Sequence, residues 1–233
     1  MSALALLTQG DGVTRMVAFV LLAMSVASWV VIFWKGWLLR RAGQDLPRAM
    51  AAFWQAPDWA VALQRVEPFD REQLVQPLLA AAQETSSGTL AATGDRAQQL
   101  TRVLRDALHR VLDKLQFGQV LLATVGSTAP FVGLLGTVWG IYHALTSIAG
   151  SGQITIDKVS GPVGEALIMT AAGLAVAIPA VLAYNVYGRL SGRLEADLEG
   201  FARDLRELLA PSRSPAGASR PDGQQAQPGE AGA

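Results

Sequence analysis

Residues 163–187 read VGEALIMTAAGLAVAIPAVLAYNVY and carry a single charge, on Glu165. A helix needs about 20 mainly apolar residues to cross the hydrocarbon core of a bilayer, which is about 30 Å thick. Two more stretches meet this requirement, at 16–39 and at 117–145, and the central part of the first contains no charge. The sequence therefore predicts an all-α, polytopic membrane protein with three transmembrane helices.

Composition limits the functions that the chain can have. Of the 233 residues, 51% are hydrophobic and 16% are charged, whereas soluble domains carry about 25% charged residues. The formal net charge is zero, so there is no basic field to attract nucleic acid. There is no cysteine, and the two histidines, His109 and His143, lie too far apart for a zinc-type spacing. We predict no nucleic-acid partner, no disulfide, no metal and no cofactor.

The first stretch has a rival interpretation as a cleaved signal peptide. Residues 25–27 resemble a cleavage site, but the apolar run continues past them and the positive charges follow it rather than precede it. We therefore interpret 16–39 as a retained span. Lys35 is expected to extend to the lipid headgroups. The tryptophans that suit an interfacial belt are Trp29, Trp34 and Trp37.

Lysine and arginine placement predicts the orientation, because cytoplasmic loops carry an excess of both. Residues 40–116 contain ten and residues 188–233 contain six, whereas residues 1–15 and 146–162 contain one each. The N-terminus is therefore expected outside and the C-terminus in the cytoplasm. In order, the predicted segments are an outer N-terminus (1–15), the first span (16–39), a cytoplasmic helical domain (40–116), the second span (117–145), an outer loop (146–162), the third span (163–187), a cytoplasmic helix (188–210) and a disordered tail (211–233).

Apolar residues recur every three or four positions beyond the cytoplasmic ends of the second and third spans, which indicates helices with one apolar face. They are Leu100, Val103, Leu104, Ala107, Leu108, Val111, Leu112 and Leu115 before the second span, and Leu190, Leu194, Leu198, Phe201, Leu205 and Leu208 after the third. We expect the first of these helices to run straight into the second span. Both spans would then extend into the cytoplasm as a helical bundle. The tail has too little apolar surface to fold.

Glu165 is the residue most suited to carry the function. An ionised side chain at the centre of a membrane helix costs about 2.5–3.5 kcal/mol on insertion scales, so it is found where it has a partner, a cavity or a functional task. A carboxyl group that takes up and releases a proton would make Glu165 a proton carrier. The alternative is that Glu165 lies at the membrane interface and is simply hydrated.

Two threonines inside the spans, Thr137 and Thr170, allow two interpretations. A threonine in a helix usually bonds the carbonyl one turn back, which would make both inert. As side chains lining a cavity, they would relay or solvate a proton near Glu165. Glu165 and Thr170 are five residues apart, about 140° around a helix, so they cannot both face the same partner.

Small residues are frequent in the second and third spans and predict close helix packing, because they let backbones approach in lipid. The glycines that we assign to helix packing are Gly133, Gly136, Gly140 and Gly173. An enzyme is disfavoured. Ser127 and His143 lie sixteen residues apart on one predicted helix, too far to form a nucleophile and its base. No phosphate-binding glycine loop follows a strand, so we predict no catalytic residue.

Two stretches resemble the MotA/TolQ/ExbB proton-channel family. Residues 126–141 read GSTAPFVGLLGTVWGI, and residues 161–185 begin with GPVGEALIMT and end with AIPAVLAYN. They are similar to the second and third spans of the ExbB branch, and the TolQ branch shares much of this signature. The resemblance covers about half of the chain strongly and agrees with the predicted three-span topology.

The resemblance implies a proton-driven motor subunit in the inner membrane of a Gram-negative bacterium, with a periplasmic N-terminus. Family members form a homopentamer around a dimer of the single-span protein ExbD, which brings an aspartate into the pore. The complex drives TonB, which opens outer-membrane receptors for siderophores or cobalamin. Glu165 matches the intramembrane glutamate of the family, and Thr137 and Thr170 match its pore threonines.

Two alternatives stay open at this point. The first is a TolQ-like subunit that serves envelope maintenance with TolR and TolA. The second is a non-conducting membrane scaffold, in which the polar residues of the spans only hold helices together.

Overall fold

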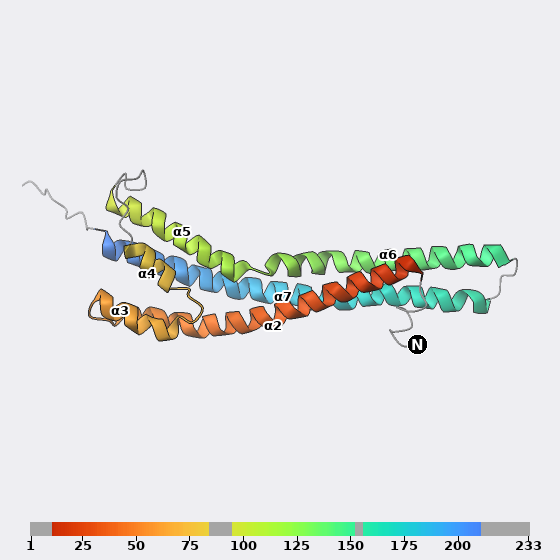
Figure 1. Cartoon of the computed structure of the whole chain (residues 1–233), viewed down its shortest axis with the longest axis horizontal. Coiled ribbons are helices and arrows are strands. Elements are labelled where there is room, and N and C mark those ends of the chain that lie inside the picture. Colours follow the sequence, from red (N-terminus) through yellow and green to blue (C-terminus); the bar gives the residue numbers. More distant parts are fainter. Residues whose placement is uncertain (1–10, 84–94, 152–155, 211–233) are drawn as a thin grey trace, which may run out of the picture.

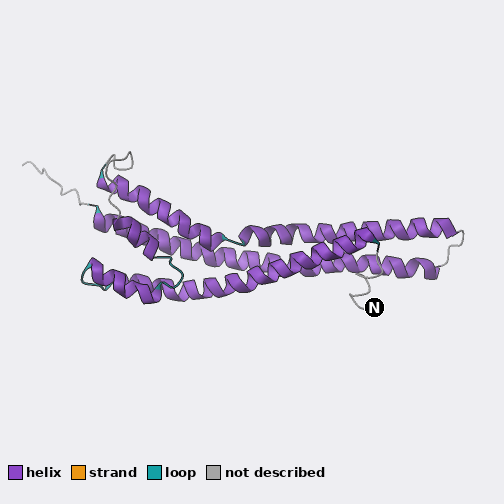
Figure 2. Cartoon of the chain, viewed as in Figure 1, coloured by secondary structure: helices purple, strands orange, loops and turns teal. Residues whose placement is uncertain are grey.

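The computed structural model describes residues 11–83, 95–151 and 156–210, and no strand occurs among them. The elements are α2 (Gly12–Trp54), α3 (Trp59–Val66), the 3-10 helix η1 (Glu67–Phe69), α4 (Gln76–Gln83), α5 (Arg96–Gln116), α6 (Gln119–Ser151) and α7 (Ile156–Leu209). Within each described range, consecutive α-helices are joined by short turns (Figure 2). The all-α prediction is confirmed.

Three helical stretches of the described residues are long and apolar enough to cross a membrane. They are Gly12–Trp54, Arg96–Thr146 and Ser160–Leu209. In Figure 1, the molecule is an elongated rod, and α2, α6 and α7 run together along one half of it. The prediction of three transmembrane helices is confirmed.

The other half of the rod is a helical bundle (Figure 1). Here α3, α4 and α5 surround the C-terminal half of α7 and the end of α2, over one apolar cluster. Phe53 of α2 lies edge-on to both Trp59 and Phe201, with ring centroids 5.5 Å and 5.3 Å apart. The third span thus continues into the bundle within α7, and the chain next to the second span enters it as the separate helix α5, so both apolar repeats lie in the bundle as predicted.

The turn between α5 and α6 corrects one expectation. The helix before the second span does not run straight into it, because α5 ends at Gln116 and α6 begins at Gln119. Phe117 between them has an extended ψ of 137°, and Gly118 has a φ of 81°. Glycine adopts this left-handed backbone without the steric cost that a Cβ would bring. Gly118 therefore ends one helix and starts the next.

The boundary between α6 and α7 also differs from the predicted outer loop at 146–162. The helix α6 continues to Ser151, and α7 already begins at Ile156. Hydropathy predicts where a helix crosses the bilayer, whereas a helix can extend beyond that point, so the helix ends do not test the predicted span boundaries. Residues 1–10 of the predicted N-terminus and the predicted tail at 211–233 lie outside the described residues.

All four glycines assigned to packing lie where α6 and α7 are in contact, and Gly136 also faces α2. A Cβ on Gly133 would be 2.6 Å from the Met169 carbonyl oxygen, and one on Gly173 would be 2.6 Å from the Ala129 carbonyl oxygen. Along the same seam, Gly136 faces Met169 and Val17, and Gly140 faces Ala166. Backbone therefore touches backbone at the centre of the α6–α7 hairpin.

Replacing Gly173 by alanine tests this contact. We expect Gly173→Ala to destabilise the purified protein by about 1–3 kcal/mol, because the added methyl group meets a backbone carbonyl that cannot move aside. Thermal unfolding in detergent, followed by circular dichroism, measures the change. Gly192→Ala on the same helix is the matched control, since nothing lies within 4 Å of that position. An equal melting temperature for the two variants would contradict the close contact.

Candidate functional site

Thr137 and Thr170 lie together across the α6–α7 seam. The Thr170 hydroxyl donates a hydrogen bond to Thr137 Oγ1 at 3.3 Å, and Thr137 Oγ1 donates to the Leu134 carbonyl at 2.6 Å. Thr137 is 4% exposed, and Thr170 is partly buried. The two predicted hydroxyl groups thus form a short chain that ends on a backbone carbonyl.

The glycine seam is what brings the two threonines within reach. Thr137 directly follows Gly136, and Thr170 directly follows Met169, which Gly136 faces. A Cβ on Gly133 would be 3.2 Å from the Thr170 Cα, so α7 passes α6 at backbone distance one turn away. Larger residues here would separate the two hydroxyl groups.

Glu165 lies on a different side of α7 and is exposed. It is about 140° around the helix from Thr170. Residues 7, 11 and 18 positions after Glu165 lie on the same side of α7, because these spacings are close to whole helical turns. All three pack against the apolar cluster that includes Val17 and Leu21 of α2. They are Ala172, Val176 and Ala183. Glu165 is therefore on the side of α7 that faces α2 further along the helix.

The level of Glu165 along the rod is that of the beginning of α2. Its neighbour Ala166 faces Gly140 of α6, and the adjacent Trp139 donates its indole N–H to Asp11 Oδ2 at 3.1 Å. Asp11 immediately precedes α2. This hydrogen bond and a second one from the Gly12 amide lower the pKa of the Asp11 carboxyl from its ordinary value. Glu165 thus sits where α2 stops covering the hairpin.

The surroundings of Glu165 on the outer surface of α7 are apolar. Ile168, three residues after Glu165 and about 60° around the helix from it, is 47% exposed. An exposed carboxyl group beside such a residue would face lipid at a cost of a few kcal/mol if nothing else covered it. A second protein surface or a water-filled space next to Glu165 removes that cost. The free-energy cost of Glu165 therefore depends on whether headgroup water, a cavity or another protein surface lies beside it.

His143 acts electrostatically on the Asp11 carboxyl, and Ser127 is satisfied within its own helix. His143 is exposed on α6, and Ser127 donates to the Thr124 carbonyl one turn back at 3.1 Å. Within the part of the chain that the structure describes, no group of three or more His, Cys, Asp or Glu side chains could hold a metal ion.

One residue has a role that the sequence did not indicate. Lys35 was expected to extend to the headgroups, and this is wrong, because its exposed fraction is 0%. Its ammonium group donates to the carbonyls of Leu115 and Phe117, at 2.5 Å and 2.8 Å. The available signal was a lone lysine inside an apolar stretch, but the carbonyls that bind it lie 80 residues or more away in sequence.

The fold and site define an integral membrane protein with three helical spans, a glycine-packed hairpin and one carboxyl group on its apolar surface. The model of the MotA/TolQ/ExbB proton channel family matches residues 70–200. The chain belongs to the MotA/TolQ/ExbB proton channel family, as its resemblance indicated.

Several relatives match the chain over most of its length. It is 44% identical to the biopolymer transport protein ExbB of Xanthomonas campestris pv. campestris (strain B100), over 86% of this chain and 83% of the relative. It is 37% identical to the ExbB of Neisseria meningitidis serogroup A, over 86% of this chain and 93% of the relative. The Tol-Pal system protein TolQ of Pseudomonas aeruginosa is 35% identical, over 88% of this chain and 90% of that protein.

Substitution of Thr137 tests the hydroxyl chain. Thr137→Val keeps the shape but leaves the Thr170 hydroxyl without its acceptor, and we expect a loss of about 0.6 kcal/mol, the average for such bonds between membrane helices. Thr137→Ser is the matched control, because it changes the same residue but keeps the hydroxyl group. Thermal unfolding in detergent compares the two. A valine variant as stable as the serine variant would show that the bond contributes nothing.

Proposed function

We propose that this chain is the proton-channel subunit of an inner-membrane ExbB–ExbD complex, which uses the proton motive force to energise TonB. TonB would in turn drive active transport of siderophores or cobalamin through outer-membrane receptors. The observation that carries the proposal is Glu165, a titratable group exposed on an apolar membrane helix of a family member. The identity to ExbB proteins over most of the chain supports this branch of the family.

The positions of the polar groups support an assembly of several copies. Glu165 is exposed and points about 140° around α7 from Thr170, whose hydroxyl lies in the α6–α7 seam, so one chain cannot pass a proton directly between them. In a ring of hairpins, a neighbouring copy or an enclosed partner helix would cover the exposed Glu165. The family resemblance supports a homopentamer that encloses a dimer of ExbD helices.

The proposed cycle is a change in the protonation of Glu165. An ionised carboxylate has to stay next to water or a partner charge, whereas a protonated carboxyl group can face apolar surface. Protonation from the periplasm and release toward the cytoplasm would alter which partner surface packs on α7. Each elementary charge that crosses a potential of 100 mV supplies about 2.3 kcal/mol, so a few protons can drive a mechanical step.

The TolQ-like function is the second candidate, and the 35% identity to TolQ of Pseudomonas aeruginosa favours it. Its chemistry would be the same, with TolR and TolA in place of ExbD and TonB. The third candidate function is a non-conducting scaffold. It is the least favoured, because a scaffold does not need an exposed glutamate on an apolar helix.

Replacement of Glu165 in the native host tests the proposal. Glu165→Gln keeps size and hydrogen bonding but cannot cycle a proton, and we expect iron–siderophore uptake to fall to the level of a gene deletion. Membrane levels and co-purification of the partner check that the complex still forms. Glu199→Gln, also exposed on α7, is the control that should retain uptake.

The other outcomes separate the alternatives. Normal uptake in Glu165→Gln, together with loss of uptake in the deletion, would reject the proton carrier and favour the scaffold. Normal uptake in the deletion, with leakage of periplasmic proteins and no paralogue to substitute, would favour the TolQ-like function.

The proposed orientation is testable because the chain has no cysteine of its own. Gly161→Cys and Gly192→Cys place single thiols at exposed positions with nothing within 4 Å. We expect a membrane-impermeant maleimide to label position 161 in spheroplasts, and position 192 only after the membrane is permeabilised. The reverse pattern would invert the predicted topology.

A further inference from the structure

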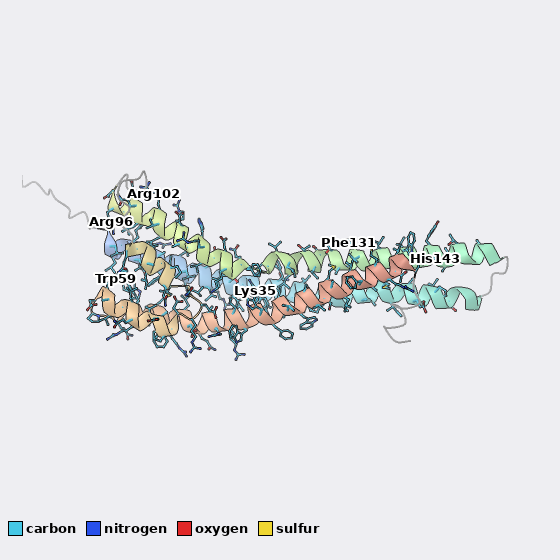
Figure 3. All side chains as sticks on the ribbon, in the orientation of Figure 1. Lys35, Trp59, Arg96, Arg102, Phe131 and His143 are labelled. Carbon is cyan, nitrogen blue, oxygen red and sulfur yellow. The ribbon has the colours of Figure 1, made fainter. Side chains whose placement is uncertain are left out.

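One turn of α2, residues 31–35, contacts the turn between α5 and α6 through several side chains. The Val31 Cγ1 atom would be 2.7 Å from a Cβ on Gly118, and the ring of Trp34 lies edge-on to Phe117 with centroids 5.6 Å apart. Lys35 binds the carbonyls of Leu115 and Phe117. We name residues 115–118 together with this turn of α2 the joint. In Figure 3, Lys35 lies midway along the rod, where α5 and α6 meet.

The break between α5 and α6 explains why a lysine is buried there. In an uninterrupted helix, the Leu115 carbonyl would accept the amide N–H of residue 119, but the turn at 117–118 removes that partner. A cation is favoured at the negative end of a helix, where such carbonyls point outward. Lys35 supplies two of the missing donors, and the carbonyls compensate the cost of burying its charge.

The third helix is attached at the same place. The Tyr187 hydroxyl of α7 donates to the Ile32 carbonyl at 2.8 Å. The Ser191 hydroxyl, one turn further along α7, lies 3.5 Å from the same Leu115 carbonyl that Lys35 binds. The joint therefore ties α2, α7 and the end of α5 to one another through polar contacts.

We propose that Lys35 is a positioning residue that locks the angle between α5 and α6, so that movement of the membrane spans passes into the bundle. The helices α2 and α7 are continuous through this level, whereas α5 and α6 are connected only by Phe117 and Gly118. Two residues with non-helical backbone would let α6 swing relative to α5 if nothing else held them. Lys35 binds both the last turn of α5 and the turn itself, and so removes that freedom.

The mechanical consequence rests on the proposed function, but the lock does not. If Lys35 locks the joint, its loss loosens residues 115–122 locally, whether or not the chain conducts protons. If the proposed motor function is also correct, its loss impairs transport while Glu165 and the α6–α7 seam stay intact.

Hydrogen exchange tests the lock in the full-length protein, purified from membranes with its native partners. The amides of Phe117 and Leu122 donate to Asp113 and Gly118 on either side of the joint. In Lys35→Met we expect a peptide covering both to exchange faster by about tenfold, because local opening becomes easier. Peptides over the α6–α7 seam should be unchanged.

Lys114→Met is the matched control. Lys114 also donates to a carbonyl, that of Glu72, at 2.6 Å, but its side chain is 43% exposed. This variant should leave exchange at the joint unchanged. Tyr187→Phe removes only the hydroxyl that binds Ile32 and should give a smaller increase at the same peptide, and it decides the matter if Lys35→Met does not reach the membrane.

The possible results separate clearly. Faster exchange confined to the joint in Lys35→Met supports the lock. Unchanged exchange, or an equal increase along the whole rod, overturns it, because the first means that Lys35 holds nothing and the second means a general loss of stability. For Tyr187→Phe alone, unchanged exchange at the joint overturns it as well. The siderophore uptake of the same variant then measures the coupling separately.

Discussion

The contact of backbone with backbone at Gly133 and Gly173 is the constraint on which the membrane half of the structure depends. Helices in lipid gain little from the hydrophobic effect when they associate, so close packing has to supply the attraction. With α6 and α7 held this near, Thr137 and Thr170 reach each other and Ala166 meets Gly140. The larger apolar side chains of both helices are left to face outward, where they contact lipid or other protein.

The polar groups of this hairpin differ in where they lie, because the threonines are in the seam and Glu165 is on the surface. The threonine hydroxyls are satisfied within the chain, one by the other and the second by a carbonyl. Glu165 stands exposed on an apolar surface, at the level where α2 begins. An ionised carboxylate costs free energy in lipid, so Glu165 needs water or another protein surface beside it. The titratable residue is at the edge of the subunit, where its environment is set by what packs against it.

Much of this arrangement could be predicted from the sequence, and the exceptions share a cause. Length and hydropathy are enough to find three spans, and small residues at helical spacing are enough to find the seam. The role of Lys35 was missed because a hydropathy argument places a lone charged side chain at the nearest water. Its actual partners are carbonyl groups that a helix break leaves free, 80 residues or more away in the chain. Gly118, with its positive φ, cannot be told from a packing glycine by sequence alone. The roles of Lys35 and Gly118 both depend on tertiary contacts, which cannot be predicted from the local sequence pattern.

The helix α7 runs for 54 residues without a break, which corresponds to about 80 Å at 1.5 Å per residue. Its first part carries Glu165 and its last part lies in the bundle, so a tilt of α7 about the level of the joint would displace both ends. A tilt of about 5° at the membrane end moves the far end of a lever arm of half this length by about 3–4 Å, the scale of a side-chain repacking. A small rearrangement around Glu165 would therefore displace the opposite end of the molecule without any unfolding in between.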